Sequence, residues 1–117
     1  MSDAAKVDRV QTRSIGEPGR ALSRARMHHF VLDSSSGPGE GLTNSEAFLA
    51  GISSCGVTLI EKYAQGDGVP VAGMEVDIYG VRSPDGSPRF ESIDMRFRIR
   101  GVGQREAERL VGVWQDR

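Results

Sequence analysis

Cys55 is the only cysteine among the 117 residues, so its chemistry sets what this chain can do by covalent catalysis. A lone thiol cannot form an internal disulfide. It is therefore either a small buried hydrophobe or a nucleophile that needs a partner from outside the chain. Cysteine is among the most often buried residue types, and Cys55 lies between Ile52 and Leu59 in an apolar run, which favours the buried alternative.

The immediate neighbours of Cys55 favour the reactive alternative. They are unusually small, and small neighbours let a substrate or another backbone come close to the thiol. Thiolate is the reactive form of cysteine, and a nearby cation favours it. The small neighbours are Gly51, Ser53, Ser54 and Gly56, and the cations of the preceding segment are Arg13, Arg20, Arg24 and Arg26.

The element that carries Cys55 is predicted to be a long helix with marked ends. Thr43 and Glu46 have the S/T-x-x-E spacing of a capping box, which by itself explains the glutamate. Gly66 and Gly68 are expected to end the helix, with Pro70 soon after. Steps of three and four predict one apolar stripe, made of Phe48, Ile52, Cys55, Leu59 and Tyr63.

Helix geometry separates Glu46 from Cys55. Nine residues turn through about 900°, which places the two side chains on roughly opposite sides and about 13 Å apart along the axis. They cannot touch within one regular helix. If Glu46 serves Cys55, it does so from a partner subunit or through a break in the helix, and we therefore hypothesise two composite sites at a dimer interface.

The other segments predict an α+β fold, with helices on one face of a curved antiparallel sheet. Residues 6–12 are a weak strand candidate, 13–23 read as a loop, 24–32 as a strand and 33–42 as a flexible loop. Alternating apolar residues predict two further strands around 74–79 and 93–99. A second amphipathic helix is expected from Ala107, Leu110, Val111 and Trp114.

Composition limits the classes of protein. A chain of 117 residues suits a single domain, and 38% hydrophobic residues with 15 glycines make a lean core that a homodimer would complete. The net charge of −1 gives no global attraction to nucleic acid or a membrane surface. One cysteine and no signal-like N-terminus fit a reducing cytoplasm. His28 and His29 point to opposite sides of a strand, so no metal site is expected.

The segment from Asn44-Ser45-Glu46 to Ser54-Cys55 resembles the motif of the OsmC/Ohr family, the osmotically induced and organic-hydroperoxide-resistance proteins. In that motif a glutamate precedes the cysteine by nine or ten residues, and the stretch before the cysteine is rich in small residues. The spacing of nine is closer to the general OsmC-like branch than to the Ohr branch. The order of elements, including the strand at 28–33, resembles the family along nearly all 117 residues.

The resemblance implies a thiol peroxidase. Cys55 would attack an organic hydroperoxide and become a sulfenic acid. Glu46 would orient an arginine that stabilises the thiolate, and Arg20 and Arg24 are the candidates for that arginine. No cofactor is implied beyond an external thiol or dithiol reductant. The resemblance also implies an intertwined homodimer.

Two departures from the family pattern bear on this interpretation. Asn44 replaces the proline that leads the helix. The family's resolving cysteine would be expected just past Arg117, so either the chain lacks that C-terminal part or it is a one-cysteine member. One alternative is therefore an OsmC-like dimeric module without peroxidase activity, which binds a small ligand or thiol at the interface. Another is a nucleic-acid-binding module that uses the row Arg96, Arg98 and Arg100.

Overall fold

The computed structural model describes residues 5–86 and 89–116. The chain divides into two compact units, Met1–Ala47 and Phe48–Arg117. The fold is α+β, with antiparallel sheets and two helices, as the sequence predicts. None of the described helices is both long enough and apolar enough to cross a membrane.

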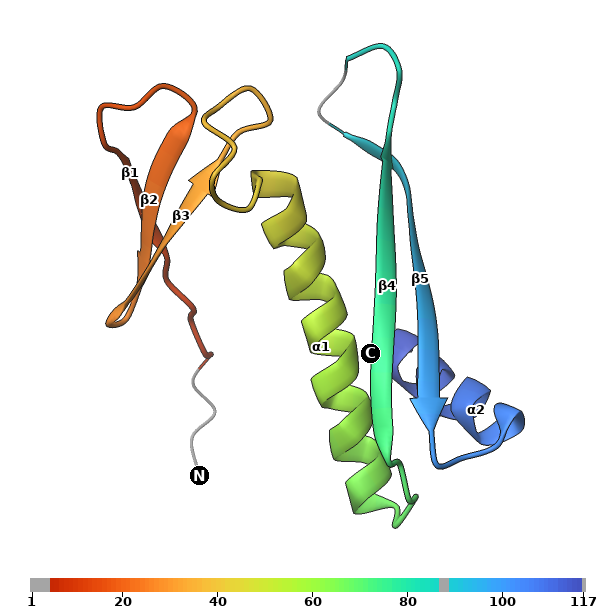
Figure 1. Ribbon diagram of the computed structural model, residues 1–117. Coiled ribbons are helices and arrows are strands. Elements are labelled where there is room, and N and C mark those ends of the chain that lie inside the picture. Colours follow the sequence, from red (N-terminus) through yellow and green to blue (C-terminus); the bar gives the residue numbers. More distant parts are fainter. Residues whose placement is uncertain (1–4, 87–88, 117) are drawn as a thin grey trace. The chain divides into compact units, whose positions relative to one another are not determined.

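The first unit is built on a three-stranded antiparallel sheet in the order β1 (Gln11–Ser14), β2 (Arg20–Ala25) and β3 (His28–Asp33) (Figure 1). Arg24 is aligned with Gln11 on one side and His29 on the other. Leu22, two residues before Arg24 in β2, is aligned with Arg13 and Val31. Arg20, at the start of β2, is aligned with Asp33. Since side chains alternate along a strand, these residues all lie on one face of the sheet.

The strand pattern predicted for the first unit is wrong in two places. The weak strand expected at 6–12 is β1 at Gln11–Ser14, and the loop expected at 13–23 contains most of β2. The single strand expected at 24–32 contains the end of β2, a two-residue turn and most of β3. The turn residues are Arg26, with a φ of 57°, and Met27, which is 89% exposed. Two-residue hairpin turns usually carry Asn, Asp or Gly, because these residues tolerate positive φ. Arg-Met carries no such signal.

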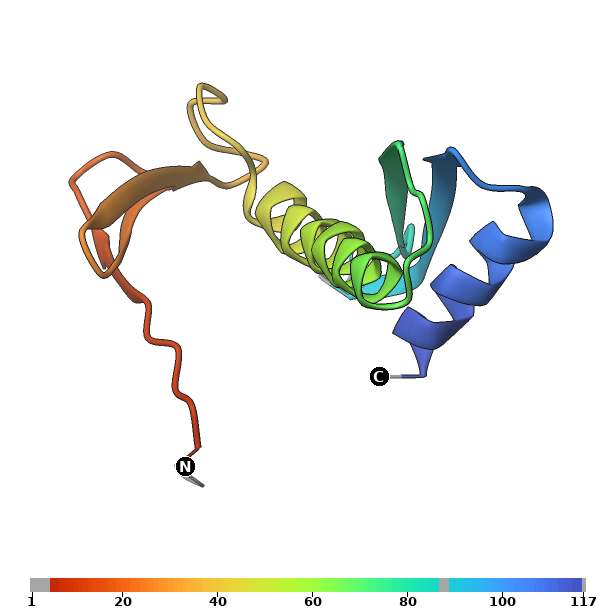
Figure 2. The ribbon, with the colours of Figure 1, turned by 90° about the horizontal axis from the view of Figure 1, so that it is seen from below.

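The second unit packs helices on one face of a long hairpin. Helix α1 (Asn44–Gly66) begins in the first unit and continues through the second, and β4 (Gly73–Arg82) pairs with β5 (Phe90–Arg100) before α2 (Gln104–Gln115). Both helices lie on the same side of the hairpin (Figure 2). The predicted strands and the second helix are confirmed here. The single predicted sheet is instead two sheets, β1-β2-β3 and β4-β5.

The core of the second unit joins both helices to the hairpin. Its buried centre is Ile60 and Ala64 of α1 with Leu110 of α2. Phe97 of β5 meets the edge of the Trp114 ring, with ring centroids 5.7 Å apart. Part-buried apolar side chains pack against this centre: Val69, Val71, Met74, Ile99 and Val111.

The buried face of α1 is turned away from the stripe that the sequence predicts. The buried positions are Gly56, Ile60 and Ala64. Phe48 is 56% exposed and Cys55 is also exposed. Gly56 and Ala64 leave room for α2 on either side of the buried Ile60, so the packed face is centred one residue away from the predicted stripe.

Gly56 has a packing reason to be glycine. A Cβ at this position would lie 3.2 Å from Cζ2 of Trp114, whereas a Cβ at Gly51, more than one turn earlier, would meet nothing within 4 Å. The small residue next to Cys55 therefore makes room for the indole ring of α2.

We expect Gly56→Leu to lower the free energy of unfolding by about 1–3 kcal/mol, because the new side chain displaces Trp114 from the core. Gly51→Leu, in the same helix but facing open space, should leave stability unchanged or raise it by up to about 1 kcal/mol through helix propensity. Urea unfolding midpoints followed by Trp114 fluorescence would compare the two. Equal effects at both positions would contradict the packing assigned to Gly56.

Candidate functional site

The thiol of Cys55 is accessible on α1. The hydroxyls of Ser53 and Thr58 are not free to serve it as donors, because each is engaged with backbone oxygens of its own helix. Ser53 Oγ donates to the carbonyls of Leu49 and Ala50, at 3.1 and 3.2 Å. Thr58 Oγ1 donates to the carbonyl of Ser54 at 3.0 Å and lies 3.4 Å from that of Cys55. Neither of these two hydroxyls is therefore available as a donor to the exposed thiol.

The exposed ring of Phe48 lies on the same side of α1 as Cys55 and pairs with the half-buried ring of Phe90. Phe48 precedes Cys55 by two helical turns, which is about 10 Å along the axis. Its ring stacks on Phe90 of β5, with centroids 6.1 Å apart and planes 13° from parallel. A Cβ at Gly80 would lie 2.5 Å from Phe90, so only glycine lets this ring lie against β4. The Arg82 guanidinium covers Phe90 at 5.8 Å from the ring centre.

Glu46 forms the capping box that the sequence predicts. Its Oε1 accepts a hydrogen bond from the backbone N–H of Thr43 at 2.9 Å, and Thr43 Oγ1 accepts one from the N–H of Glu46 at 3.0 Å. The side chain of Glu46 is exposed. Helix α1 is continuous from Asn44 to Gly66, so no break brings Glu46 round to Cys55.

Arg20 is held by two carboxylates of its own unit. Its Nε donates to Asp33 Oδ1 at 2.7 Å, and its Nη2 donates to Asp33 Oδ2 at 3.0 Å and to Glu40 Oε1 at 2.9 Å. Asp33 is fully buried, and its Oδ2 also accepts the backbone N–H groups of Glu40 and Gly41, at 2.8 and 2.9 Å. Asp33 was not predicted from the sequence. The pattern that could have indicated it is a charged residue at the end of an apolar strand, just before a glycine-rich loop.

This network shifts both partners toward their charged forms. The hydrogen bonds from Arg20 hold the pKa of Asp33 well below its usual 3.8, while burial opposes the shift and the two backbone N–H groups add to it. The hydrogen bonds to Asp33 and Glu40 likewise raise the pKa of Arg20. Asp33 therefore stays ionised in the folded protein down to strongly acidic pH.

Arg24 is placed differently from Arg20, although both lie on the same face of the three-stranded sheet. It is exposed, and it is flanked across the strands by Gln11 and His29. No ion pair among the described residues involves Arg24. Of the two candidate arginines, Arg20 has its charge balanced within the first unit and Arg24 does not.

The basic row on β5 is balanced by acids on β4. Arg98 lies 3.6 Å from both Glu75 and Asp77, and Arg100 bonds to Glu75. Arg96 covers the ring of Tyr79 at 5.1 Å. A row neutralised in this way offers little net charge to a phosphate backbone.

His28 and His29 project to opposite faces of β3, as expected from strand geometry. Within residues 5–86 and 89–116, no group of three or more His, Cys, Asp or Glu side chains comes together as a metal site would need.

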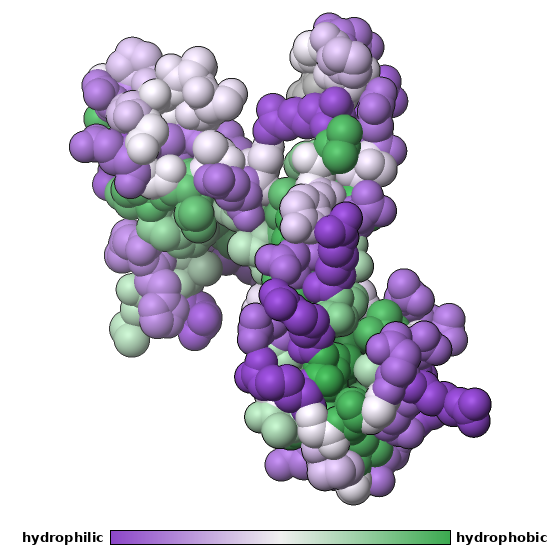
Figure 3. All heavy atoms as spheres, turned by 45° about the vertical axis from the view of Figure 1, so that its right-hand side comes forward, coloured by the Kyte–Doolittle hydropathy of each residue, from purple (hydrophilic) through white to green (hydrophobic). Residues whose placement is uncertain are grey.

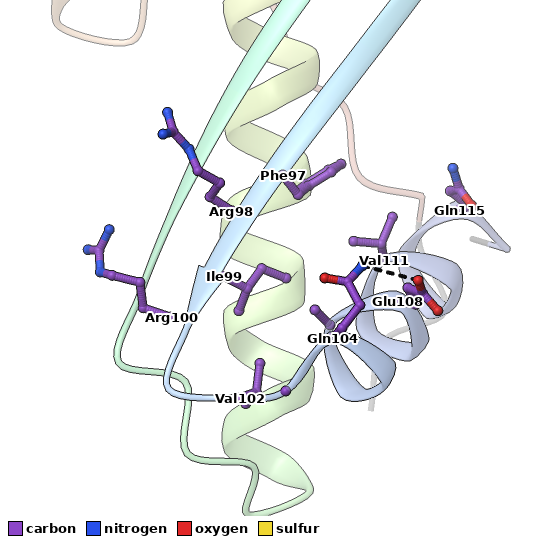
Figure 4. A pocket seen from close by; sticks show the side chains of 11 residues that line it. Phe97, Arg98, Ile99, Arg100, Val102, Gln104, Glu108, Val111 and Gln115 are labelled. Carbon is purple, nitrogen blue, oxygen red and sulfur yellow. Dashed lines mark hydrogen bonds between the residues drawn. The ribbon is translucent and has the colours of Figure 1, made fainter.

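The largest cavity described is a groove of about 630 Å³ between β5 and α2 (Figure 4). Phe97, Ile99 and Val111 point into it, while Arg98 and Arg100 project to the other side of the strand. On its rim, Gln104 Nε2 donates to Glu108 Oε1 at 3.1 Å. The lining mixes apolar and polar residues, and Cys55 is not among them. It offers packing surface rather than reactive groups.

Comparison with known proteins identifies the family. The chain matches the family described as OsmC-like protein over residues 37–116. Among solved structures, it is similar to an OsmC-like protein from Mycoplasma pneumoniae, with a TM-score of 0.84 and 16% identity, covering 97% of this chain and 84% of that one. No curated protein sequence gives a match.

Two further structures carry functional names. One is an organic hydroperoxide resistance protein OsmC from Legionella pneumophila, with a TM-score of 0.72, 18% identity and coverage of 97% and 85%. The other is the organic hydroperoxide resistance protein OhrB of Bacillus subtilis, with a TM-score of 0.69, 15% identity and coverage of 97% and 86%. At these identities the likeness shows a shared fold. Together with the family match over residues 37–116, it shows that this chain belongs to the OsmC-like protein family.

We expect Asp33→Asn to lower the unfolding midpoint in urea at pH 7, because it leaves Arg20 without its main partner. The folded-state pKa of Asp33 is depressed, so the stability it contributes is fully present above its usual value of 3.8 and is lost as the pH falls below that value. The difference between wild type and Asp33→Asn should therefore shrink on acidification.

Glu40→Gln is the matched control, since Glu40 contacts the same guanidinium but is 75% exposed. It should change the midpoint much less than Asp33→Asn. A midpoint difference for Asp33→Asn that does not depend on pH would argue against an ionised Asp33 as the stabilising group.

Proposed function

We propose that this chain reduces organic hydroperoxides with a thiol, as part of a defence against oxidative stress, with Cys55 as the nucleophile. The observation that carries the proposal is the exposure of Cys55 on α1, on the side where Phe48 and Phe90 offer an apolar, aromatic surface. Membership of a family whose solved structures include organic hydroperoxide resistance proteins supports the same reaction.

The chemistry balances with two equivalents of an external thiol. The Cys55 thiolate attacks the terminal oxygen of the hydroperoxide, the O–O bond breaks, and the alkoxide leaves as the alcohol after taking up a proton. Cys55 is then a sulfenic acid. One external thiol condenses with it to a mixed disulfide and releases water; a second thiol releases Cys55 and leaves as the external disulfide. An external reductant is required because the 117 residues hold one cysteine.

The proposal gives supporting roles to Glu46 and to an arginine of β2. A guanidinium near the sulfur would favour the thiolate and stabilise the negative charge that develops on the leaving oxygen. Arg20 brings a guanidinium already fixed in direction by Asp33, and Arg24 brings one without a competing carboxylate. Glu46 would orient the arginine, in addition to capping α1.

We further propose that the protein acts as a homodimer in the cytoplasm, in which Glu46 of one subunit serves Cys55 of the other. Within one chain the two residues lie on opposite sides of a continuous helix. The second unit has large apolar side chains on its surface (Figure 3), which a partner subunit would bury at the interface. Those at least one-third exposed are Phe48, Tyr79, Val81 and Ile93.

A second candidate function is a dimeric OsmC-like module that binds a small ligand or thiol without reducing peroxide. The engagement of Arg20 favours it, because its guanidinium is already held by Asp33 and Glu40. Nucleic-acid binding through Arg96, Arg98 and Arg100 is the weaker alternative, since Glu75 and Asp77 neutralise much of that row.

Intact-mass spectrometry distinguishes the first two functions. One equivalent of cumene hydroperoxide added to the reduced protein should raise its mass by about 16 Da at Cys55, or give an adduct when a small thiol is present. Arg20→Gln and Arg24→Gln, tested separately, should show which arginine matters through a slowing of about tenfold or more in this step. Cys55→Ser is the control. Oxidation confined to methionines, with Cys55 unchanged, would leave only the binding module.

Mixed dimers test the composite site. Cys55→Ser and Glu46→Ala proteins should each be inactive or slow as homodimers. When their subunits are exchanged, one site per mixed dimer would combine an intact Cys55 with an intact Glu46 from the other chain, so activity should reappear. A mixture that stays as slow as its components would show that Glu46 does not act across the interface.

A further inference from the structure

The face of the three-stranded sheet that carries Arg24 has a small cup with an unusual concentration of positive charge. The cup has a volume of about 280 Å³ and is lined by one or more residues from each strand: Gln11, Arg13, Leu22, Arg24 and His29. The register explains why they converge. Gln11, Arg24 and His29 stand in one row across β1, β2 and β3, and Arg13 and Leu22 stand in the next row of the same face.

The cations of the cup lack the acidic partners that balance other arginines of this chain. Arg20, Arg98, Arg100 and Arg109 each contact a carboxylate. No ion pair among residues 5–86 and 89–116 involves Arg13 or Arg24, and all three basic residues of the cup are exposed. Asp8 lines a neighbouring cavity with Arg9, Arg24 and Arg26, so basic residues outnumber acids there as well.

Cross-strand geometry brings two positive charges of this face together. Diagonal neighbours on antiparallel strands are about 7–8 Å apart, within reach of long side chains, and like charges there repel. Arg13 lies on the diagonal from Arg24, and His29 lies directly opposite Arg24. The cup is surrounded by two guanidinium groups, an imidazole and a glutamine amide. All four can donate hydrogen bonds to the oxygens of an oxyanion.

We propose that this cup binds the phosphate group of a small phosphate monoester. The two guanidinium groups would donate to the three terminal phosphate oxygens between them, while Gln11 and His29 donate to further lone pairs on the same oxygens. A phosphate monoester, with two negative charges near neutral pH, matches two guanidiniums better than a single carboxylate does. The cup is smaller than the cavities that bury a whole drug-sized ligand, so it holds a charged head group and leaves the rest of the molecule outside.

The site shares Arg24 with the thiol reaction if Arg24 is the arginine that serves Cys55, but its readout is separate. It needs neither Cys55 nor Glu46, and binding should be the same for the Cys55→Ser protein. If Cys55 proves not to react with peroxide, the phosphate site is unaffected. If the cup proves not to bind phosphate, the peroxidase proposal is unaffected.

Phenyl phosphate titrated into labelled protein, followed by NMR, tests the proposal. The side-chain Nε–H signals of Arg13 and Arg24 and the backbone amides around Gln11 and His29 should shift together with one dissociation constant. The double variant Arg13→Gln/Arg24→Gln should weaken binding by about tenfold or more, and Arg13→Lys/Arg24→Lys should weaken it to an intermediate degree because the planar fork is lost. Arg98→Gln, which removes an equally exposed arginine that has acidic neighbours, should bind like wild type.

Several results would overturn the proposal. They are shifts that spread evenly over all arginines, unchanged affinity in the glutamine double variant with its fold intact by NMR, or lysine variants that bind as well as wild type. An unlabelled single-stranded oligonucleotide that binds far more tightly than phenyl phosphate, and perturbs residues well beyond the cup, would assign the surface to nucleic acid instead. Equal binding of benzoate would remove the preference for phosphate.

Discussion

The buried carboxylate of Asp33 is the constraint on which the first unit depends. A buried charge is tolerated only when its hydrogen-bonding capacity is met, and Asp33 meets it with the guanidinium of Arg20 and two backbone N–H groups of the following loop. The backbone of the same residue donates to Leu42 and forms a bridge to Thr43. Through its side chain and its backbone, this one residue fixes the end of β3, the loop after it and the residue that caps α1.

This arrangement ties the position of Glu46 to the sheet. Thr43 is held beside Asp33, and Glu46 is held by Thr43. A glutamate with a proposed role in catalysis thus gains a fixed backbone from interactions that are structural in origin. Capping and catalysis do not compete for the same atoms, because the carboxylate of Glu46 uses one oxygen for the cap and has the other available.

Some arginines of this chain are paired with carboxylates and others are not. The paired ones stabilise the fold, and the unpaired ones are available to a ligand. The β5 row is opposed by Glu75 and Asp77 across the hairpin, and Arg20 is opposed by Asp33. Arg13 and Arg24, one strand apart on the same sheet, have no such opposition among the described residues. The net charge of −1 conceals this difference, since it sums over surfaces that a ligand would meet separately.

Much of α1 and of the second unit follows from local sequence. The capping box at Thr43 and Glu46, the alternation along β4 and β5 and the spacing of Leu110 and Trp114 each encode an element through period or cap chemistry. The first unit was harder to predict. The β2–β3 turn is made of Arg26 and Met27, which lack the residues that tolerate positive φ most easily, so nothing local marks the hairpin.

By itself the sequence determined the α+β class, the extent of α1, the alternation of β4 and β5, and the presence of one thiol near small residues. Only the tertiary structure decided which side of α1 is buried, because an apolar band on a helix is wide and packing partners such as Trp114 select its centre. It likewise decided that Arg20 is paired and Arg24 is not. Strand register brings residues distant in sequence face to face, and no local pattern encodes it.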